Sequence, residues 1–132
     1  MFEPEKVTKQ YGQTTVLHET TLTVNDGEFF VLVDVGESGK TTLLKLLNRL
    51  IDPTSGAILR NGNSLHDLNL QSLRLDTGYM LQQIALFPNL TVGENIVLVP
   101  SMKHIDKNEI RRRSHLWLEK TALDPLQSRG LI

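Results

Sequence analysis

Residues 29–48 combine an apolar run, two glycines and a lysine in an order that suits the binding of phosphate groups. The run 29–33 is typical of a buried strand, and the leucines at the end of the stretch recur at helical spacing. Between them, Gly36 and Gly39 let consecutive backbone N–H groups form a concave anion site at the start of the helix. The pattern therefore predicts a strand, a phosphate loop and a helix, with Lys40 on the outer phosphates of a nucleotide.

The residues around this lysine extend the predicted chemistry to magnesium. The hydroxyl of Thr41 is expected on a Mg²⁺ ion that bridges the phosphates, and the hydroxyl of Thr42 on phosphate oxygens. An ordinary glycine turn between a strand and a core helix is the structural alternative, because it needs no ligand. The full predicted phosphate-loop set is Gly36, Glu37, Ser38, Gly39, Lys40, Thr41 and Thr42.

Two carboxylates lie in the same loop and oppose an anionic ligand. The motif G-x-x-x-x-G-K-[ST] has a glycine at the position of Asp34, so the match is partial, and Glu37 lies between the two glycines that remain. At about 6 Å and an effective dielectric of about 20, each carboxylate repels one phosphate charge by roughly 3 kcal/mol. Magnesium and salt reduce this repulsion. We therefore expect the carboxylates to weaken nucleotide binding without excluding it.

The composition limits the other functions open to the chain. It has 132 residues, the size of one domain, with a formal net charge of -1 and no cysteine. The absence of cysteine excludes disulfides and thiolate metal sites. The near-neutral net charge gives no support for nucleic-acid binding. The basic run 111–113 is typical of a solvated helix face. The polar N-terminus and the lack of a long apolar stretch predict no signal peptide and no direct membrane insertion.

Alternating and apolar patterns predict five strands around the phosphate loop. Pro4 lacks a backbone donor, which predicts a sheet-edge position for the first strand. Residues 25–27 predict a tight turn, and Asp52 with Pro53 predicts the end of the helix that follows Lys40. The expected strands are 1–9, 14–24, 28–33, 55–60 and 77–81.

The last third of the chain has helical patterns. Thr91 and Glu94 have the spacing of a capping box, so they predict a helix start, and Pro100 predicts the end of that helix. Asp106 predicts the start of a second helix. Trp117 falls on the more apolar side of this second helix, so we expect it to pack inside the protein rather than to contact a ligand.

Several separated motifs occur in one order along the chain. They are 9–12, the phosphate loop, 52–56, 78–82, 86–92 and 94–96. Taken together, they resemble the ATP-binding subunit of ABC transporters from about residue 7 to residue 123. The resemblance implies an α/β fold, the N-terminal portion of an ABC-type P-loop NTPase. It implies a partial nucleotide-binding domain over 1–132, with an antiparallel β subdomain, the phosphate loop and the Q-loop in 1–82, the start of a helical subdomain in 83–125, and a tail in 126–132.

The same resemblance assigns roles to further residues and implies ATP and Mg²⁺ as cofactors. Tyr11 would stack on adenine, with Val16 beside the ring. Gln82 would link magnesium and the attacking water to a membrane subunit, so Thr41 and Gln82 are the residues implied at the metal. A turn tyrosine with a solvated hydroxyl is the alternative for Tyr11.

Two short segments look most like one group of importers within this family. Residues 46–53 and 70–74 resemble importers of glycine betaine, carnitine or choline, the osmoprotectant group. The family implies transmembrane permease subunits and a second ATP-binding subunit as partners. It also implies a cytoplasmic, peripheral location on the inner face of the plasma membrane, through the permease.

Some motifs of the family do not occur in the sequence. There is no Leu-Ser-Gly-Gly-Gln signature, no apolar strand ending in Asp-Glu and no matching switch histidine. We therefore expect no catalytic residue in this chain and no efficient ATP hydrolysis by it alone. The alternative is a truncated, non-hydrolysing relative with a degenerate phosphate loop, acting at most as a nucleotide-binding or subunit-interaction module. A small P-loop kinase is disfavoured because no lid with its arginines is evident.

Overall fold

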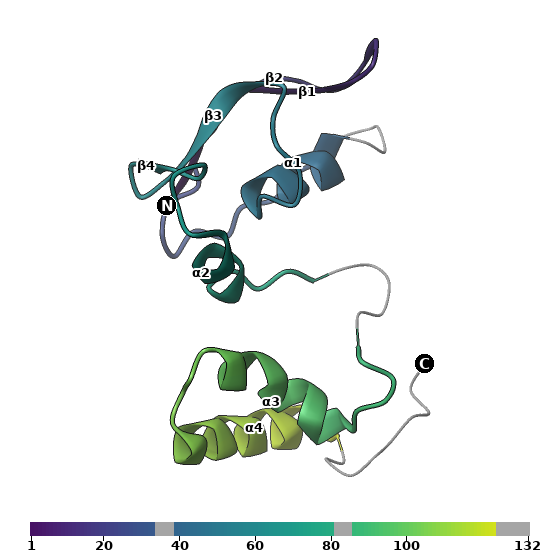
Figure 1. Cartoon of the computed structure of the whole chain (residues 1–132), viewed down its shortest axis with the longest axis vertical. Coiled ribbons are helices and arrows are strands. Elements are labelled where there is room, and N and C mark those ends of the chain that lie inside the picture. The colour runs from purple at the N-terminus through teal and green to yellow at the C-terminus, as the bar shows by residue number, and fades with distance from the viewer. Residues whose placement is uncertain (34–38, 81–85, 124–132) are drawn as a thin grey trace. The chain divides into compact units, whose positions relative to one another are not determined.

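The computed structural model describes residues 1–33, 39–80 and 86–123, which belong to two units, Met1–Thr77 and Gly78–Ile132 (Figure 1). The predicted boundary between 82 and 83 lies outside the described residues. The first unit contains strands β1 (Phe2–Tyr11), β2 (Thr14–Thr20), β3 (Ser55–Arg60) and β4 (Asn63–Ser64), and helices α1 (Gly39–Leu47) and α2 (Leu70–Leu75). The second unit contains helices α3 (Val92–Met102) and α4 (Lys107–Thr121).

The four strands form one antiparallel sheet with the order β2-β1-β3-β4. This order makes β1 an inner strand, so the sheet-edge position predicted from Pro4 is wrong. The Pro4 side chain is fully buried, and its carbonyl accepts a hydrogen bond from Leu22 N at 3.1 Å. The missing N–H of Pro4 is tolerated because the regular β1–β2 ladder begins only at Val7, opposite Thr20.

A bulge in β1 sets the path of the strand toward its C-terminal end. The β1–β3 register shifts between Glu5 and Thr8, where Lys6 has a φ of 48°. Gly56 of β3 lies against this bulge with a φ of +81°, and a Cβ atom there would meet the Lys6 carbonyl oxygen at 2.3 Å. Glycine is therefore required at this position on both conformational and steric grounds.

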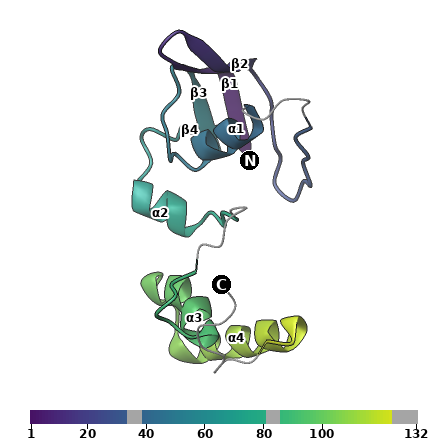
Figure 2. The same cartoon turned by 90° about the vertical axis from the view of Figure 1, so that its right-hand side faces the viewer.

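The apolar core of the first unit lies between the sheet and α1 (Figures 1 and 2). Leu43 and Leu46 of α1 pack in one cluster with Val7 of β1 and Ile58 of β3, and these side chains are 3%, 1%, 0% and 5% exposed. This packing confirms the helical spacing that the leucines after Lys40 predict. The other buried members of the cluster are Leu17, Leu65 and Leu73.

The helix α1 ends at Leu47, before the end predicted from Asp52 and Pro53. Arg49 has a left-handed φ of 48°, and Leu50 N donates a hydrogen bond to the Lys45 carbonyl at 2.8 Å. These two features form the Schellman pattern of a helix end, which glycine or asparagine usually provides. The predicted end is therefore wrong, because the backbone turns at an arginine that gives no sequence signal.

Two of the five predicted strands are wrong. Residues 28–33 carry no strand, and Phe29 and Val33 are 92% and 89% exposed instead of buried. The described residues 77–80 of the last predicted strand carry none either, and Met80 is 96% exposed. An apolar run becomes a buried strand only where neighbouring strands satisfy its backbone, and no described strand pairs with either segment.

The helix α3 begins at the predicted capping box and extends past its predicted end. Thr91 Oγ1 accepts a hydrogen bond from Glu94 N at 3.2 Å, and Glu94 Oε2 accepts one from Thr91 N at 2.7 Å, which confirms the start. The helix then runs through Pro100 to Met102, so the predicted end is wrong. A proline in the last turn removes only one intrahelical hydrogen bond, and the helix continues past it.

The helix α4 is capped at its start by Asp106, as predicted, and has Trp117 on its exposed side. Asp106 Oδ1 accepts a hydrogen bond from Asn108 N at 2.9 Å. Trp117 is 57% exposed, with Lys120 Nζ at 5.2 Å from the ring centre, so the prediction that it packs inside the protein is wrong. The buried position of α4 is Ile110 instead, because only a narrow stripe of this helix is covered.

Candidate nucleotide-binding site

The first turn of α1 carries the central residues of the predicted phosphate site. Gly39 opens the helix, and Lys40, Thr41 and Thr42 follow directly. Thr41 is exposed, whereas Thr42 is 9% exposed and precedes the core residue Leu43. The N–H groups of a first helical turn lack intrahelical partners and carry the positive end of the helix dipole. This turn is therefore suited to bind a phosphate group.

Part of the predicted site lies outside the described residues. It comprises Gly36, Glu37, Ser38 and Gln82. The contacts of these residues with phosphate and magnesium stay predictions. The described part of the predicted set is Tyr11, Val16, Gly39, Lys40, Thr41 and Thr42.

Lys40 is half-buried and borders an open pocket of about 480 Å³ beside α1. The rest of the lining is apolar and includes Leu22, Phe30 and Leu44. An apolar lining offers phosphate no hydrogen-bond donors, so the start of α1 is the better phosphate site. Residues 29–32, from the predicted buried strand, line this pocket together with the apolar side of α1.

Tyr11 ends β1 and presents its aromatic ring to solvent. The residue is 54% exposed, and Lys9 Nζ lies over the ring at 4.9 Å from its centre. The same Nζ donates a hydrogen bond to the Asp52 carbonyl at 2.8 Å. A ring with a cation on one face leaves its other face for a planar base. Figure 1 draws the turn after β1 and the start of α1 on the same side of the first unit.

Val16 lies in β2 at a bulge opposite the end of β1. Lys9 pairs with Leu17 and Gln10 pairs with Thr15, so Val16 is the extra residue between them. A bulge redirects a side chain relative to the regular alternation of a strand. Val16 is half-buried. Its contact with a bound base stays a prediction.

The end of β1 is fastened to the segment that follows α1. Thr54 N donates a hydrogen bond to the Thr8 carbonyl at 2.9 Å, and Gln10 N donates one to Thr54 Oγ1 at 3.0 Å. The hydroxyl oxygens of Thr8 and Ser55 are 2.7 Å apart. These contacts fix the backbone that carries Tyr11.

Sequence reasoning missed Lys9 and Thr54 as supports of the aromatic residue. Their partners are distant in sequence, because Lys9 bonds to Asp52 and Thr54 bonds to the strand end. The spacing of Lys9 and Tyr11, two residues apart in one strand, is a signal that places both side chains on one face. Nothing in the sequence signals the hydroxyl of Thr54.

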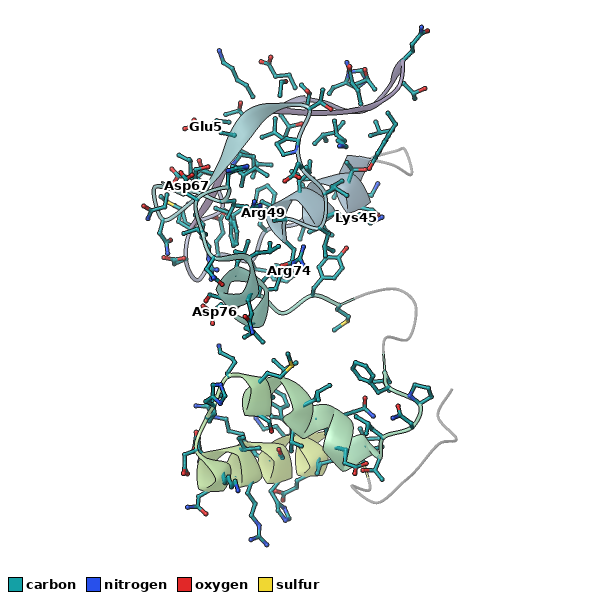
Figure 3. The ribbon with its side chains drawn as sticks, viewed as in Figure 1. Glu5, Lys45, Arg49, Asp67, Arg74 and Asp76 are labelled. Atoms are coloured by element: carbon teal, nitrogen blue, oxygen red, sulfur yellow. The ribbon has the colours of Figure 1, made fainter. Side chains whose placement is uncertain are left out.

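Two arginines hold the segment after α1 against α2 (Figure 3). Arg49 Nη1 donates hydrogen bonds to the carbonyls of Leu65 and Leu68 at 3.2 and 3.4 Å. Arg74 Nη2 donates one to the Arg49 carbonyl at 2.7 Å, and Asp52 Oδ1 lies 3.8 Å from Arg49 Nε. Hydrogen bonds from a guanidinium are stronger than neutral ones, so they position this segment well.

The residues present fit a nucleotide with magnesium. Among the described residues, no group of three or more His, Cys, Asp or Glu side chains is placed to hold a metal ion. A magnesium site of the predicted type needs no such group, because phosphate oxygens and water supply most of its ligands. The exposed Thr41 hydroxyl is a suitable protein ligand for it. No helix in the described ranges has the length and apolar character needed to cross a bilayer.

In the second unit, two glutamates have lowered pKa values. Hydrogen bonds from Arg112 and Arg113 lower the pKa of Glu109 to about 2, with the two Nε atoms at 2.8 and 2.5 Å from its oxygens. Hydrogen bonds from the backbone and side chain of Thr91 lower the pKa of Glu94. All these partners lie within one helical turn, so the shifts reflect helix capping and local ion pairs rather than a catalytic site.

The architecture agrees with one class of protein. An antiparallel sheet with an exposed aromatic residue at the end of β1, and a helix between β2 and β3 that opens with Gly-Lys-Thr-Thr, match the ATP-binding cassette expected from the sequence. Comparison with protein families gives the same result, since the model described as ABC transporter matches residues 17–131. The chain belongs to the ABC transporter family.

Three curated relatives are similar over much of the chain. The osmoprotectant import ATP-binding protein OsmV of Salmonella typhimurium is 42% identical over 129 residues, which cover 94% of this chain and 34% of OsmV. The carnitine transport ATP-binding protein OpuCA of Listeria monocytogenes is 42% identical over 103 residues, 77% of this chain and 26% of OpuCA. The spermidine/putrescine import ATP-binding protein PotA of Legionella pneumophila is 36% identical over 131 residues, 99% of this chain and 35% of PotA. The chain thus spans about a third of the length of OsmV and PotA.

A solved structure supports the fold. The dimeric, post-hydrolysis structure of the ATP-binding cassette MJ0796 bound to ADP and Pi matches this chain with a TM-score of 0.75 at 26% identity. The match covers 98% of this chain and 62% of that one. The predicted fold class, part of an ATP-binding cassette with an antiparallel β subdomain, is therefore confirmed.

Proposed function

We propose that this chain is part of the ATP-binding subunit of an ABC importer, which couples ATP binding and hydrolysis to uptake of an osmoprotectant such as glycine betaine, choline or carnitine. The nucleotide-binding part rests on one observation: the start of α1 presents Lys40 and an exposed Thr41, in the same unit as the exposed ring of Tyr11. The names of OsmV and OpuCA support the solute class. Both proteins are 42% identical to this chain.

Each predicted site residue has one task in this proposal. The backbone of 36–39 and the Lys40 ammonium bind the phosphates, while the Thr41 hydroxyl and Gln82 bind magnesium. Tyr11, with Val16 beside it, stacks on the adenine. Bound MgATP supplies the phosphoanhydride bond whose cleavage drives transport. Hydrolysis is proposed for the complete importer, because no residue of this chain is assigned the role of general base.

The proposal includes two kinds of partner and a location. Permease subunits in the plasma membrane would receive the conformational signal, and the ATP-binding subunit would lie peripherally on the cytoplasmic face. A second ATP-binding subunit would complete the site. The dimeric state in the MJ0796 structure supports this second subunit.

A non-hydrolysing nucleotide-binding or subunit-interaction module is the second candidate function. Asp34 and Glu37 favour it, because two carboxylates in a phosphate loop repel the ligand. The first candidate requires that the loop, as it stands, binds ATP, whereas the second predicts weak binding or none.

Fluorescent ATP in the presence of magnesium separates these candidates. We expect the chain to bind the ligand and Lys40→Ala to weaken binding about tenfold or more, because a charge-assisted contact with phosphate is lost. Lys45→Ala is the matched control, since Lys45 is an exposed lysine of the same helix (Figure 3). Equal effects of the two substitutions would contradict a phosphate site at the start of α1.

The double substitution Asp34→Gly with Glu37→Gly tests the loop carboxylates. We expect it to tighten ATP binding, because two repulsive charges are removed. If the parent chain fails to bind ATP and the double variant binds it, the second candidate, a non-hydrolysing module, becomes the proposed function of this chain. If neither binds, a nucleotide site in this chain is ruled out and only the subunit-interaction role of the second candidate remains.

A further inference from the structure

Lys9 contacts the aromatic ring at the end of β1 from one side. Lys9 and Tyr11 are two residues apart in a strand, so their side chains project from the same face. Lys9 Nζ lies 4.9 Å from the centre of the Tyr11 ring and donates a hydrogen bond to the Asp52 carbonyl at 2.8 Å. One ammonium group therefore joins the ring to the chain segment that follows α1.

The Asp52 carbonyl is a fixed anchor for this ammonium group. Thr54, two residues later, donates from its N to the Thr8 carbonyl and accepts from Gln10 N through its hydroxyl. The anchor and the strand end are thus held together by bonds independent of the lysine. The Lys9 side chain is also half-buried, so its stem lies along the protein rather than in solvent.

Two other cations lie over aromatic rings, and they lack this anchor. Arg60 is 5.5 Å from the centre of the Phe2 ring, and Lys120 is 5.2 Å from the centre of the Trp117 ring. Within the part of the chain that the structure describes, the side chain of neither cation donates a hydrogen bond to a second partner. The Lys9 pair is both the closest of the three and the one tied to a backbone carbonyl.

We propose that Lys9 is a positioning residue for the nucleotide base. Lys9 occupies one face of the Tyr11 ring and so holds the ring in one orientation, with its other face open. Adenine then stacks on a ring that is already ordered, so binding does not carry the entropic cost of ordering the Tyr11 side chain. The proposal rests on the proposed nucleotide-binding function and adds a residue that acts through Tyr11. Because Lys9 acts only on the stacking of the base, its substitution should not change the affinity for a polyphosphate that lacks a base.

Binding of ligands with and without a base tests this role. Lys9→Met removes the charge and keeps the length, and we expect it to weaken Mg-ATP binding about 2- to 5-fold and to leave Mg-tripolyphosphate binding unchanged. Lys9→Arg keeps the cation and should bind ATP like the parent. Lys6→Met, at an exposed lysine of the same strand, is the control. Equal losses for the two ligands would overturn the proposal.

A double-mutant cycle tests whether Lys9 acts through the ring. In a Tyr11→Leu background, Lys9→Met is expected to leave the affinity for Mg-ATP unchanged, because the ring it would orient is absent. The same 2- to 5-fold loss in that background would overturn the proposal, since it would show an effect independent of the ring.

The contact itself is measurable without a ligand, which separates the proposal from the function on which it rests. In the parent chain, the ε-methylene protons of Lys9 should show an upfield ring-current shift in NMR spectra that disappears in Tyr11→Leu. If the parent chain binds ATP but the ring-current shift is absent, the positioning role of Lys9 is overturned and the proposed function is not. If the shift is present but the parent binds neither ATP nor tripolyphosphate, the proposed function is wrong and the positioning role is overturned with it.

Discussion

The two segments next to the candidate site differ in how they are held. Residues 8–11, at the end of β1, are hydrogen-bonded to the segment 52–55 through backbone and side-chain groups. Residues 29–33 are far richer in strand-forming side chains, yet their backbone makes no hydrogen bond with any residue in the described ranges, and Phe29 is 92% exposed. The difference teaches that available pairing partners, rather than side-chain propensity, decide which segment joins the sheet.

The largest expected effect is at Gly56, where the anchored segment touches the bulge of β1. Gly56→Ala places a Cβ atom 2.3 Å from the Lys6 carbonyl oxygen at a φ of +81°. The free energy of unfolding should fall by about 2–5 kcal/mol from backbone strain and overlap together. Urea unfolding followed by circular dichroism measures this loss.

Gly62→Ala is the matched control for that substitution. Its φ is +78°, but nothing lies within 4 Å of an added Cβ atom. Only the conformational cost of about 1–2 kcal/mol is therefore expected. Equal losses at the two glycines would show that the contact of Gly56 with the bulge contributes nothing.

A smaller loss is expected from Thr54→Val, which removes the acceptor for Gln10 N at the anchored end. The free energy of unfolding should fall by about 1 kcal/mol, since one partly solvated hydrogen bond is lost. Thr14→Val is the control, because the Thr14 hydroxyl makes no hydrogen bond with any described residue. The same urea assay applies, and a loss no larger than that of the control would contradict the anchoring role of Thr54.

Phe29→Ala tests the other side of the comparison and should change the free energy of unfolding by less than about 0.5 kcal/mol. The residue is 92% exposed, whereas a buried phenylalanine would cost about 3–5 kcal/mol. Val7→Ala, at a fully buried position of β1, should cost roughly 2 kcal/mol in the same assay. A loss at Phe29 as large as that at Val7 would show that 28–33 is a buried strand after all.

The smallest expected effect comes from acid titration of the ion pairs in α4. The pKa of Glu109 is lowered from 4.5 to about 2 by Arg112 and Arg113, so its contribution to stability is present above pH 4.5 and is lost as the pH falls toward 2. The stability difference between the parent and Glu109→Gln, measured by urea unfolding at several pH values, should shrink over that range. Glu119→Gln is the control on the same helix. A difference independent of pH would contradict the pairing.

Local signals in the sequence predicted local structure well. The capping box of Thr91 and Glu94 and the cap at Asp106 need only neighbours three residues away, and both are confirmed. The leucine spacing of α1 is confirmed as well, because one helix face determines it. Features set by distant partners were missed, as with the inner position of Pro4 and the absence of a strand at 28–33.

The candidate site shows the same difference between features set by local sequence and features set by distant partners. Its helix start and aromatic residue were found from sequence, because Lys40, Thr41 and Tyr11 belong to short motifs. The contacts that hold the aromatic residue were not found, since Lys9 and its partner Asp52 come together only through the fold. Side-chain type identified the candidate groups, and tertiary structure supplied their support.

Backbone amide NMR during a titration with MgATP tests most directly whether the start of α1 and Tyr11 form one nucleotide site. We predict saturable shift changes in Gly39, Lys40 and Thr41 together with Tyr11, and none in the first turn of α4, which lies in the other unit. A titration in which the first turn of α1 and Tyr11 both stay unchanged, or in which the changes fall on α4 instead, would contradict a nucleotide site at this place.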